Sequence, residues 1–407
     1  MQSRDSVVNW RAFAPVFVLA GILFAAGVVA WLLDWRLGVD SAVYRSGAIT
    51  LWAGEPLYDG TTLNSEPWWA LLPFTYPPTA ALLFTPLAPL PVQVAWGVLG
   101  AVSVLSLAFV MWATLRALPR RPSWLVSPGT LVVLTLILEP VWRTLFLGQI
   151  NLILMALVVA DVLVLSRATG RARRFGGVLI GVAGAVKIIP MVFVGQLLVT
   201  RRWADAARAI ATFLGLQVLM YLLIPHDVTR YWGEAARDAG RTGPIYWAGN
   251  QSVNALFARL TDLSTVAWPL AIAACAVIAV PAALLVRRLY FRGDAVPAML
   301  VTAFFGLMIS PVSWSHHWVW AVPLIVFLLC RLPEHPTWRE LAAPVSVAVV
   351  YVSCVLLWMR NGRGTELRWH AGEFVLGSAY LLVPVVLGTI AAVRVLRQRR
   401  PGEKVPT

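Results

Sequence analysis

The sequence predicts an all-α protein that crosses a membrane many times. Of its 407 residues, 59% are hydrophobic and only 13% are charged, which is more apolar surface than a soluble fold can bury. The apolar residues form runs long enough to cross a bilayer, which takes about 20 residues. Basic residues cluster in alternate loops between these runs, as they do in polytopic membrane proteins.

The apolar runs predict about twelve membrane segments, some of them short or re-entrant. The first run, 13–33, is longer than the apolar core of a cleavable signal peptide and is interpreted as a retained anchor. The second, 77–115, is so long that we expect a break within it. Basic residues flank 174–201 at both ends, so we expect two short helices there that meet at Lys187-Ile188-Ile189-Pro190. Single segments are expected at 124–143, 150–166, 206–224, 265–286, 295–311, 318–332, 341–358 and 374–393.

Charge predicts the orientation of these segments. One set of alternate loops, together with the termini, holds 22 of the 33 Lys and Arg residues, and the positive-inside rule places that set in the cytoplasm. The net charge of +14 is therefore a topology signal and an attraction to anionic membrane lipids, not a sign of nucleic-acid binding. We predict one membrane domain over 1–396, in the plasma membrane, and a basic, disordered cytoplasmic tail over 397–407.

Polar motifs gather in the outward loops, of which 34–76 and 225–264 are the longest. A site whose scaffold is the spans and whose chemistry comes from the loops is expected there. Asp40 opens a segment with helical spacing that closes at Gly54-Glu55-Pro56, which predicts a short amphipathic helix at the membrane interface. Asp40 is either a catalytic carboxylate or only the cap of this helix. Four rival carboxylates share the loop: Asp34, Glu55, Asp59 and Glu66.

Lys187 is the only lysine outside the C-terminal tail, and it stands between apolar residues. An ammonium in such a place needs an anion, which is either a protein carboxylate or the phosphate of a ligand. Three arginines are further outward cations, each either a phosphate ligand or a solvated charge: Arg45, Arg143 and Arg230.

His316 and His317 follow Trp314 closely in a chain with only five histidines. Two adjacent imidazoles indicate polar recognition near a reacting group, with an interface position for one of them as the alternative. We expect no metal site, since neighbouring histidines project in different directions on a helix and no cysteine or carboxylate is close in sequence.

Amide and indole groups complete the outward motifs. The amides suit hydroxyl groups of a sugar, or else they cap loops: Gln149, Asn250, Gln251 and Asn254. Trp247 and Trp314 lie inside motif loops, where their rings can stack on a sugar rather than join the interfacial belt.

Taken together, these motifs resemble the polytopic glycosyltransferases of the C superfamily, and within it glycosyltransferase family 87. Each motif alone is weak, but their order and shared side of the membrane are specific, and they cover most of the chain. They are Asp40 followed by Val43-Tyr44, then Gly54 with Leu57-Tyr58, Tyr76-Pro77-Pro78, Gly148-Gln149 with Asn151, Lys187 with Pro190, Asn250-Gln251-Ser252, and Ser313-Trp314 with His316-His317-Trp318.

The resemblance implies a GT-C-like fold and an inverting mannosyltransferase. Its donor would be polyprenyl-phosphate mannose, and its acceptor a mannosylated glycolipid of the phosphatidylinositol mannoside or lipomannan type, joined by an α-1,2 linkage on the extracytoplasmic side. An arabinosyltransferase with a polyprenyl-phosphate arabinose donor and a lipid-linked sugar flippase are the alternatives. No cofactor or metal is required, and no motif indicates an oligomeric state.

The same resemblance implies roles for individual residues. Asp40 would be the catalytic base, because one carboxylate suffices for an inverting transfer. Lys187, His317 and Arg45 would bind the donor phosphate. Substrate contacts would come from His316, Tyr44, Tyr76, Gln149, Asn151, Asn250, Gln251 and Trp314.

Overall fold

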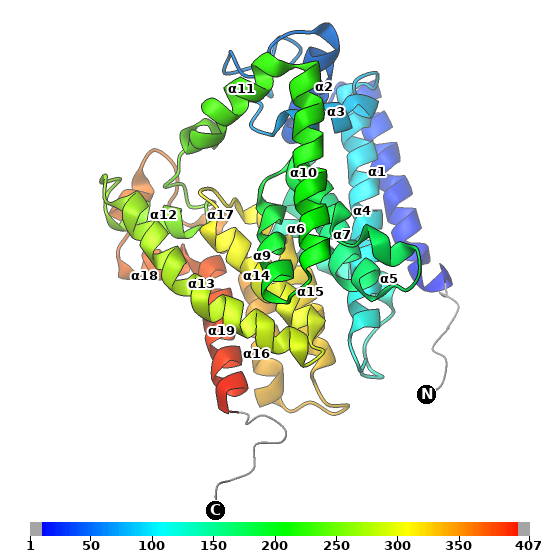
Figure 1. The fold of residues 1–407 in the computed structure, drawn as a ribbon, viewed down its shortest axis with the longest axis vertical. Helices are drawn as coiled ribbons and strands as arrows, with labels where there is room; N and C mark the ends of the chain where they lie inside the picture. Colours follow the sequence, from blue (N-terminus) through cyan, green and yellow to red (C-terminus); the bar gives the residue numbers. More distant parts are fainter. Residues whose placement is uncertain (1–9, 398–407) are drawn as a thin grey trace, which may run out of the picture.

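A computed structural model describes residues 10–397, and within them the chain forms α-helices, short 3₁₀ turns and no β-strand (Figure 1). This confirms the all-α fold class. Helix α19 ends at the lower end of the molecule in Figure 1, whereas α2 and α11 lie at its upper end. The predicted tail, apart from its first residue, lies outside the described residues.

Four helices of the described chain are long and apolar enough to cross a membrane by themselves. They are α1 (Ala14–Leu32), α4 (Val92–Ala117), α10 (Trp203–Leu223) and α13 (Ala267–Phe291). About 1.5 Å of rise per residue gives each of them the thickness of a bilayer core. In α4, 61% of the apolar window is buried within the protein, against 17% in α13. Helix α4 is therefore central, and α13 presents most of its surface to lipid.

Two of the predicted runs are broken. The run 77–115 divides into α3 (Pro78–Leu83) and α4, as expected, and prolines 86, 89 and 91 lie between them. The run 124–143, predicted as one segment, is instead α5 (Pro128–Leu134) and α6 (Glu139–Leu147), bent by 82°. Leu138 has extended backbone between the two helices, and Pro140 lies in the first turn of α6. This proline explains the break, because it offers no N–H to continue a helix from α5.

The predicted pair of short helices is present as α8 (Val178–Val186) and α9 (Val192–Val199), with Lys187 directly after α8. Gly177 lies against Asp205 and Gly181 against Thr212, so α8 runs parallel to α10. Helix α9 then returns to the start of α10, which makes the pair a re-entrant hairpin with Lys187 at its tip. Its base is anchored by the buried Asp161 carboxylate, which accepts hydrogen bonds from the N–H groups of Gly177, Leu179 and Ile180.

Helix α2 (Val39–Ala53) occupies the segment where an interfacial helix was predicted. It ends at Gly54, whose φ of +69° suits glycine. Most of its residues between 41 and 50 are buried, so it packs into the protein more deeply than an amphipathic surface helix would. Gly47 permits this packing, because a side chain there would collide with the ring of Phe74.

The remaining helices complete a bundle that is compatible with the predicted twelve segments, although the count itself stays a prediction. They are α7 (Asn151–Val159), α11 (Pro225–Gly233), α12 (Val253–Leu260), α14 (Ala295–Ile309), α15 (Ala321–Cys330), α16 (Trp338–Val352), α17 (Val355–Trp358), α18 (Ala371–Leu376) and α19 (Ala379–Arg397).

Candidate active site

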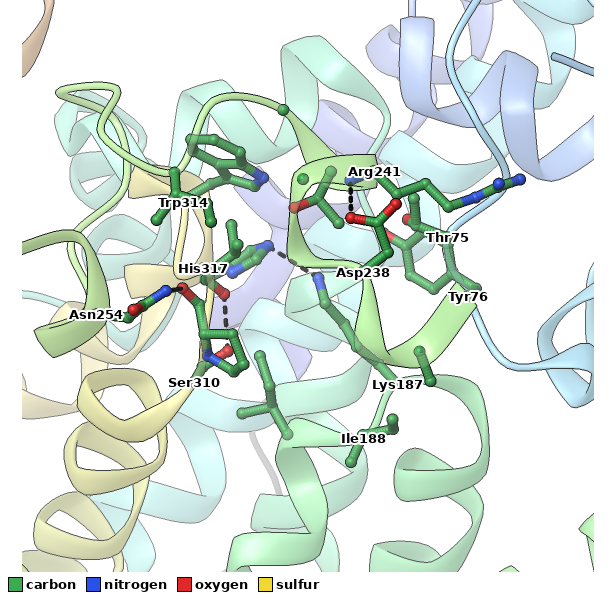
Figure 2. A pocket seen from close by; sticks show the side chains of 18 of the residues that line it. Thr75, Tyr76, Lys187, Ile188, Asp238, Arg241, Asn254, Ser310, Trp314 and His317 are labelled. Atoms are coloured by element: carbon green, nitrogen blue, oxygen red, sulfur yellow. Dashed lines mark hydrogen bonds between the residues drawn. The ribbon is translucent and has the colours of Figure 1, made fainter. Parts of the chain in front are cut away.

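One large cavity, of about 1530 Å³, opens where the long predicted outward loops meet the helices. Its walls come from α2, the hairpin tip, the 235–245 segment after α11, and the turn 310–317. Eight of the twelve predicted site residues line it: Asp40, Tyr44, Tyr76, Gln149, Lys187, Trp314, His316 and His317. Side chains distant in sequence therefore meet in one site, part of which Figure 2 shows.

Asp40 is the only carboxylate of the first predicted outward loop that lines this cavity, and all five of that loop lie in the described part of the chain. It does not cap α2, since Gly38 holds the N-cap position and no side chain there accepts a capping bond. The side chain of Gln149 stabilises the ionised form of this carboxylate. The hydroxyl groups of Tyr44 and Tyr76 donate to Gln149 Oε1 at 2.7 and 3.2 Å, which turns the amide nitrogen toward Asp40.

Burial raises the pKa of Asp40 from 3.8 to about 6, although the Gln149 hydrogen bond and the charges of Lys187 and Arg143 oppose the rise. A carboxylate with such a pKa is ionised near neutral pH and is still basic enough to take up a proton. It therefore suits general base catalysis.

Lys187 makes no ion pair with any carboxylate in the part of the chain that the structure describes. Its Nζ atom lies 3.0 Å from Asn151 Oδ1 and 3.0 Å from His317 Nε2. Figure 2 shows the side chains of Lys187 and His317 pointing toward one another. The sequence left two anions open for Lys187, a protein carboxylate and the phosphate of a ligand. Because the partners of this buried ammonium are neutral, the structure favours the ligand phosphate.

His316 presents two buried ring nitrogens, Nδ1 and Nε2, that have no hydrogen-bond partner among the residues described; His317 Nδ1 is likewise unpaired. The carbonyl oxygen of His316 accepts from Thr144 Oγ1 at 2.9 Å and from Asn151 Nδ2 at 3.0 Å. The turn is therefore fixed while the rings are left unsatisfied. Since an unpaired buried polar group is costly, these rings are suited to a polar ligand.

Three predicted site residues lie away from the cavity. Arg45 donates from Nε to the carbonyl oxygen of Leu90 at 2.6 Å. Asn250 bonds to the backbone of Ile245 and Ser313, and Gln251 to that of Ala248 and Gly377. The capping alternative therefore describes these two amides, because their hydrogen bonds fix loops rather than face the cavity.

The two motif tryptophans do lie together. Trp314 and Trp247 both line the cavity with their ring centroids 5.3 Å apart. Trp314 also bridges to the backbone of Asn250. Asn254 lines the cavity too, although its side chain donates to the carbonyl oxygen of Pro311 at 3.1 Å. Asn151 lies behind Lys187, in a small crevice that continues from the site.

Several charged groups in or near the cavity were not singled out from the sequence, among them Glu139, Arg237, Asp238 and Arg241. Asp238 lines the wall opposite the hairpin tip, and its Oδ1 accepts from the backbone N–H of Arg241 (Figure 2). Glu139 lies behind the wall and pairs with Arg143, which does line the cavity. Glu139 and Arg143 fall inside the predicted span 124–143, and this position could have identified them as candidate site residues. Charged residues within apolar segments are rare and commonly functional.

No group of three or more His, Cys, Asp or Glu residues suited to a metal ion occurs within residues 10–397. The polar groups of the cavity are the carboxylates of Asp40 and Asp238, together with cations, imidazoles and amides. They surround a space larger than the roughly 300–1,000 Å³ of ordinary small-molecule sites. Such a set can deprotonate a hydroxyl group and stabilise a departing anion without a metal. Fold and site together define a membrane-embedded group-transfer enzyme.

The chain belongs to glycosyltransferase family 87, whose family model matches residues 74–311. It is 32% identical to a protein of Mycobacterium tuberculosis, over 94% of this chain and 92% of that one. A protein of Mycolicibacterium smegmatis is 30% identical over 95% of this chain and 91% of its own length. Both are polyprenol-phosphate-mannose-dependent alpha-(1-2)-phosphatidylinositol mannoside mannosyltransferases.

A second type of relative from Mycolicibacterium smegmatis, a polyprenol-phosphate-mannose-dependent alpha-(1-2)-phosphatidylinositol pentamannoside mannosyltransferase, is 32% identical over 78% of this chain and 76% of its own. Among solved structures, ArnT from Cupriavidus metallidurans bound to undecaprenyl phosphate matches 93% of this chain and 78% of its own, with 16% identity and a TM-score of 0.36.

Proposed function

We propose that this protein is an inverting mannosyltransferase that moves mannose from polyprenyl-phosphate mannose to a mannosylated glycolipid, of the phosphatidylinositol mannoside or lipomannan type, through an α-1,2 linkage. The full-length similarity to mannosyltransferases of this donor class supports the substrates. The observation that carries the chemistry is the buried Lys187, without a carboxylate partner among the described residues, in the same cavity as Asp40.

In the transfer, the ionised Asp40 takes the proton of an acceptor hydroxyl group. The acceptor oxygen bonds to the anomeric carbon of mannose while the bond from that carbon to the phosphate oxygen breaks on the opposite face. Polyprenyl phosphate leaves with the electron pair, and Lys187 and His317 stabilise its charge. Arg143 takes the place proposed for Arg45, because of the three arginines singled out in the sequence it is the one that lines the cavity.

The remaining polar side chains of the cavity orient the sugars. His316 offers its free ring nitrogens to a substrate hydroxyl or to the phosphate. Tyr44, Tyr76 and Gln149 hold the hydroxyl groups near Asp40, and Asn151 fixes the Lys187 ammonium. Trp314, beside Trp247, is a platform for a pyranose ring.

The proposal includes the side of the membrane. The site faces out of the cell and both termini lie in the cytoplasm, in keeping with the distribution of basic residues. Mannose would then be transferred at the outer leaflet of the plasma membrane, where the isoprenoid tail of the donor stays in lipid.

A transfer assay tests the function. The purified protein in detergent should convert a phosphatidylinositol mannoside to a product that carries one more radiolabelled mannose from polyprenyl-phosphate mannose, and a chelator should leave the rate unchanged. Polyprenyl-phosphate arabinose, supplied in parallel, should yield no product. Faster transfer of arabinose would make the protein an arabinosyltransferase, and the absence of product with either donor would favour a flippase.

The rate of transfer should depend on pH through Asp40. This carboxylate must be ionised to act as a base, so the kcat/KM for the donor should rise as the pH rises through about 6. A profile that stays flat through this range in the wild type would contradict the role of Asp40 as the base.

A further inference from the structure

Glu139 is a completely buried carboxylate outside the cavity lining. It opens α6 at the 82° bend, next to the proline that breaks the helix. An ionised carboxylate is expensive to bury unless its oxygens are hydrogen-bonded and its charge is matched. The partners of Glu139 meet both conditions, and they also connect it to the site.

Both oxygens of Glu139 are occupied. Oε1 accepts from Arg143 Nη1 at 3.1 Å, one helical turn away, and from Ser315 Oγ at 2.8 Å. Oε2 accepts from the hydroxyl group of Tyr380, on α19, at 2.9 Å. One carboxylate thus joins the wall of the cavity, the turn that carries the two histidines, and the C-terminal helix.

Each of the two contacts on the cavity side fixes a functional group. Helix α6 binds the turn at two successive residues. Glu139 accepts from Ser315, which directly precedes His316, and Thr144 of the same helix donates to the His316 carbonyl. The guanidinium of Arg143 lines the cavity and lies 5.8 Å from the ring centroid of Trp247. An arginine side chain has many rotamers, and a charged partner behind it selects the one that faces the ligand.

We propose that Glu139 is a positioning residue of the transfer site, which aims Arg143 at the cavity and holds the turn that carries His316 and His317. The ion pair has its negative end inside the protein and its positive end at the wall, as when a carboxylate orients a metal-bound histidine from behind. This inference rests on the proposed function for the identity of the bound anion, but the geometry of the pair does not.

Glu139→Gln tests the proposal, because it keeps the size of the side chain and removes its charge. Transfer per folded molecule should fall by about 10- to 100-fold, and the affinity for polyprenyl phosphate, measured by its effect on the melting temperature, should fall with it. In an Arg143→Gln background the same change should cost much less, because the group that Glu139 orients is already absent.

Tyr380→Phe is the matched control. It removes a hydrogen bond from the other oxygen of the same carboxylate, on the side away from the cavity. This variant should lower the melting temperature and keep the transfer rate of the folded protein.

Equal losses of activity from Glu139→Gln in the wild-type and Arg143→Gln backgrounds would overturn the role of Glu139 in orienting Arg143. A lower melting temperature with an unchanged transfer rate would overturn both positioning roles. If the wild type transferred no mannose, the proposed function would fail instead. The binding of polyprenyl phosphate to the wild type, to Glu139→Gln, to Arg143→Gln and to the double variant would then still test whether Glu139 orients Arg143.

Discussion

Asp40→Asn is expected to fold and insert like the wild type and to lose at least about 100-fold of its mannosyl transfer. The amide keeps the shape of the carboxylate and can still meet Gln149, but it cannot accept the proton of the acceptor hydroxyl. Binding of the donor should change little, because the phosphate is held at Lys187. The measurement is single-turnover transfer with the purified variant, beside its affinity for polyprenyl phosphate.

Two other carboxylates make this test selective. Asp59 belongs to the same loop but contacts His226 and Arg230 outside the cavity, so Asp59→Asn should keep the wild-type rate. Asp238 shares the cavity with Asp40. If Asp238→Asn abolished transfer while Asp40→Asn did not, the base would be Asp238 and the assignment of Asp40 would be wrong.

Lys187→Met is expected to change activity and stability in opposite directions. Transfer should fall by about 100- to 1,000-fold, as when one preorganised donor to a developing charge is removed. The melting temperature should stay level or rise, since the variant removes a buried ammonium that has no carboxylate partner among residues 10–397. Calorimetry or a thermal-shift assay, run beside the transfer assay, measures both effects.

Arg45→Gln is the control for Lys187. It also removes an outward cation, but one whose guanidinium binds the carbonyl oxygen of Leu90 and does not reach the cavity. Transfer by this variant should be near normal. A parallel loss in both variants would mean that the general positive potential of the outer face matters, rather than the Lys187 ammonium.

The fold class could be predicted from the sequence because apolar runs and basic loops reflect the bilayer directly. The re-entrant hairpin was also predictable, since 174–201 is too short for two crossings and has basic residues at both ends. The bend after α5 was missed, although Pro140 was visible. Apolar length alone does not distinguish a straight span from two helices that meet at an angle.

The site was predictable where a residue was chemically unusual for its place. Asp40, Lys187 and His317 fall in that group, and the structure brings them to one cavity. Arg45 and Arg143 could not be separated, because the side of a helix that faces a cavity depends on the packing of other segments. Asn250 and Gln251 could not be separated from Gln149, since an amide satisfies a loop carbonyl as well as a sugar hydroxyl.

If the donor phosphate binds at Lys187, as proposed, the hairpin sets the depth in the membrane at which it is held. Helix α8 has nine residues, which correspond to about 13 Å of rise between the Asp161 anchor and the Lys187 ammonium. The ammonium therefore sits at a distance fixed by a helix and not by a loop. If the site faces outward, as proposed, the hairpin begins at the cytoplasmic side and its length sets the depth of the phosphate site. Turnover should then depend on the thickness of the surrounding bilayer.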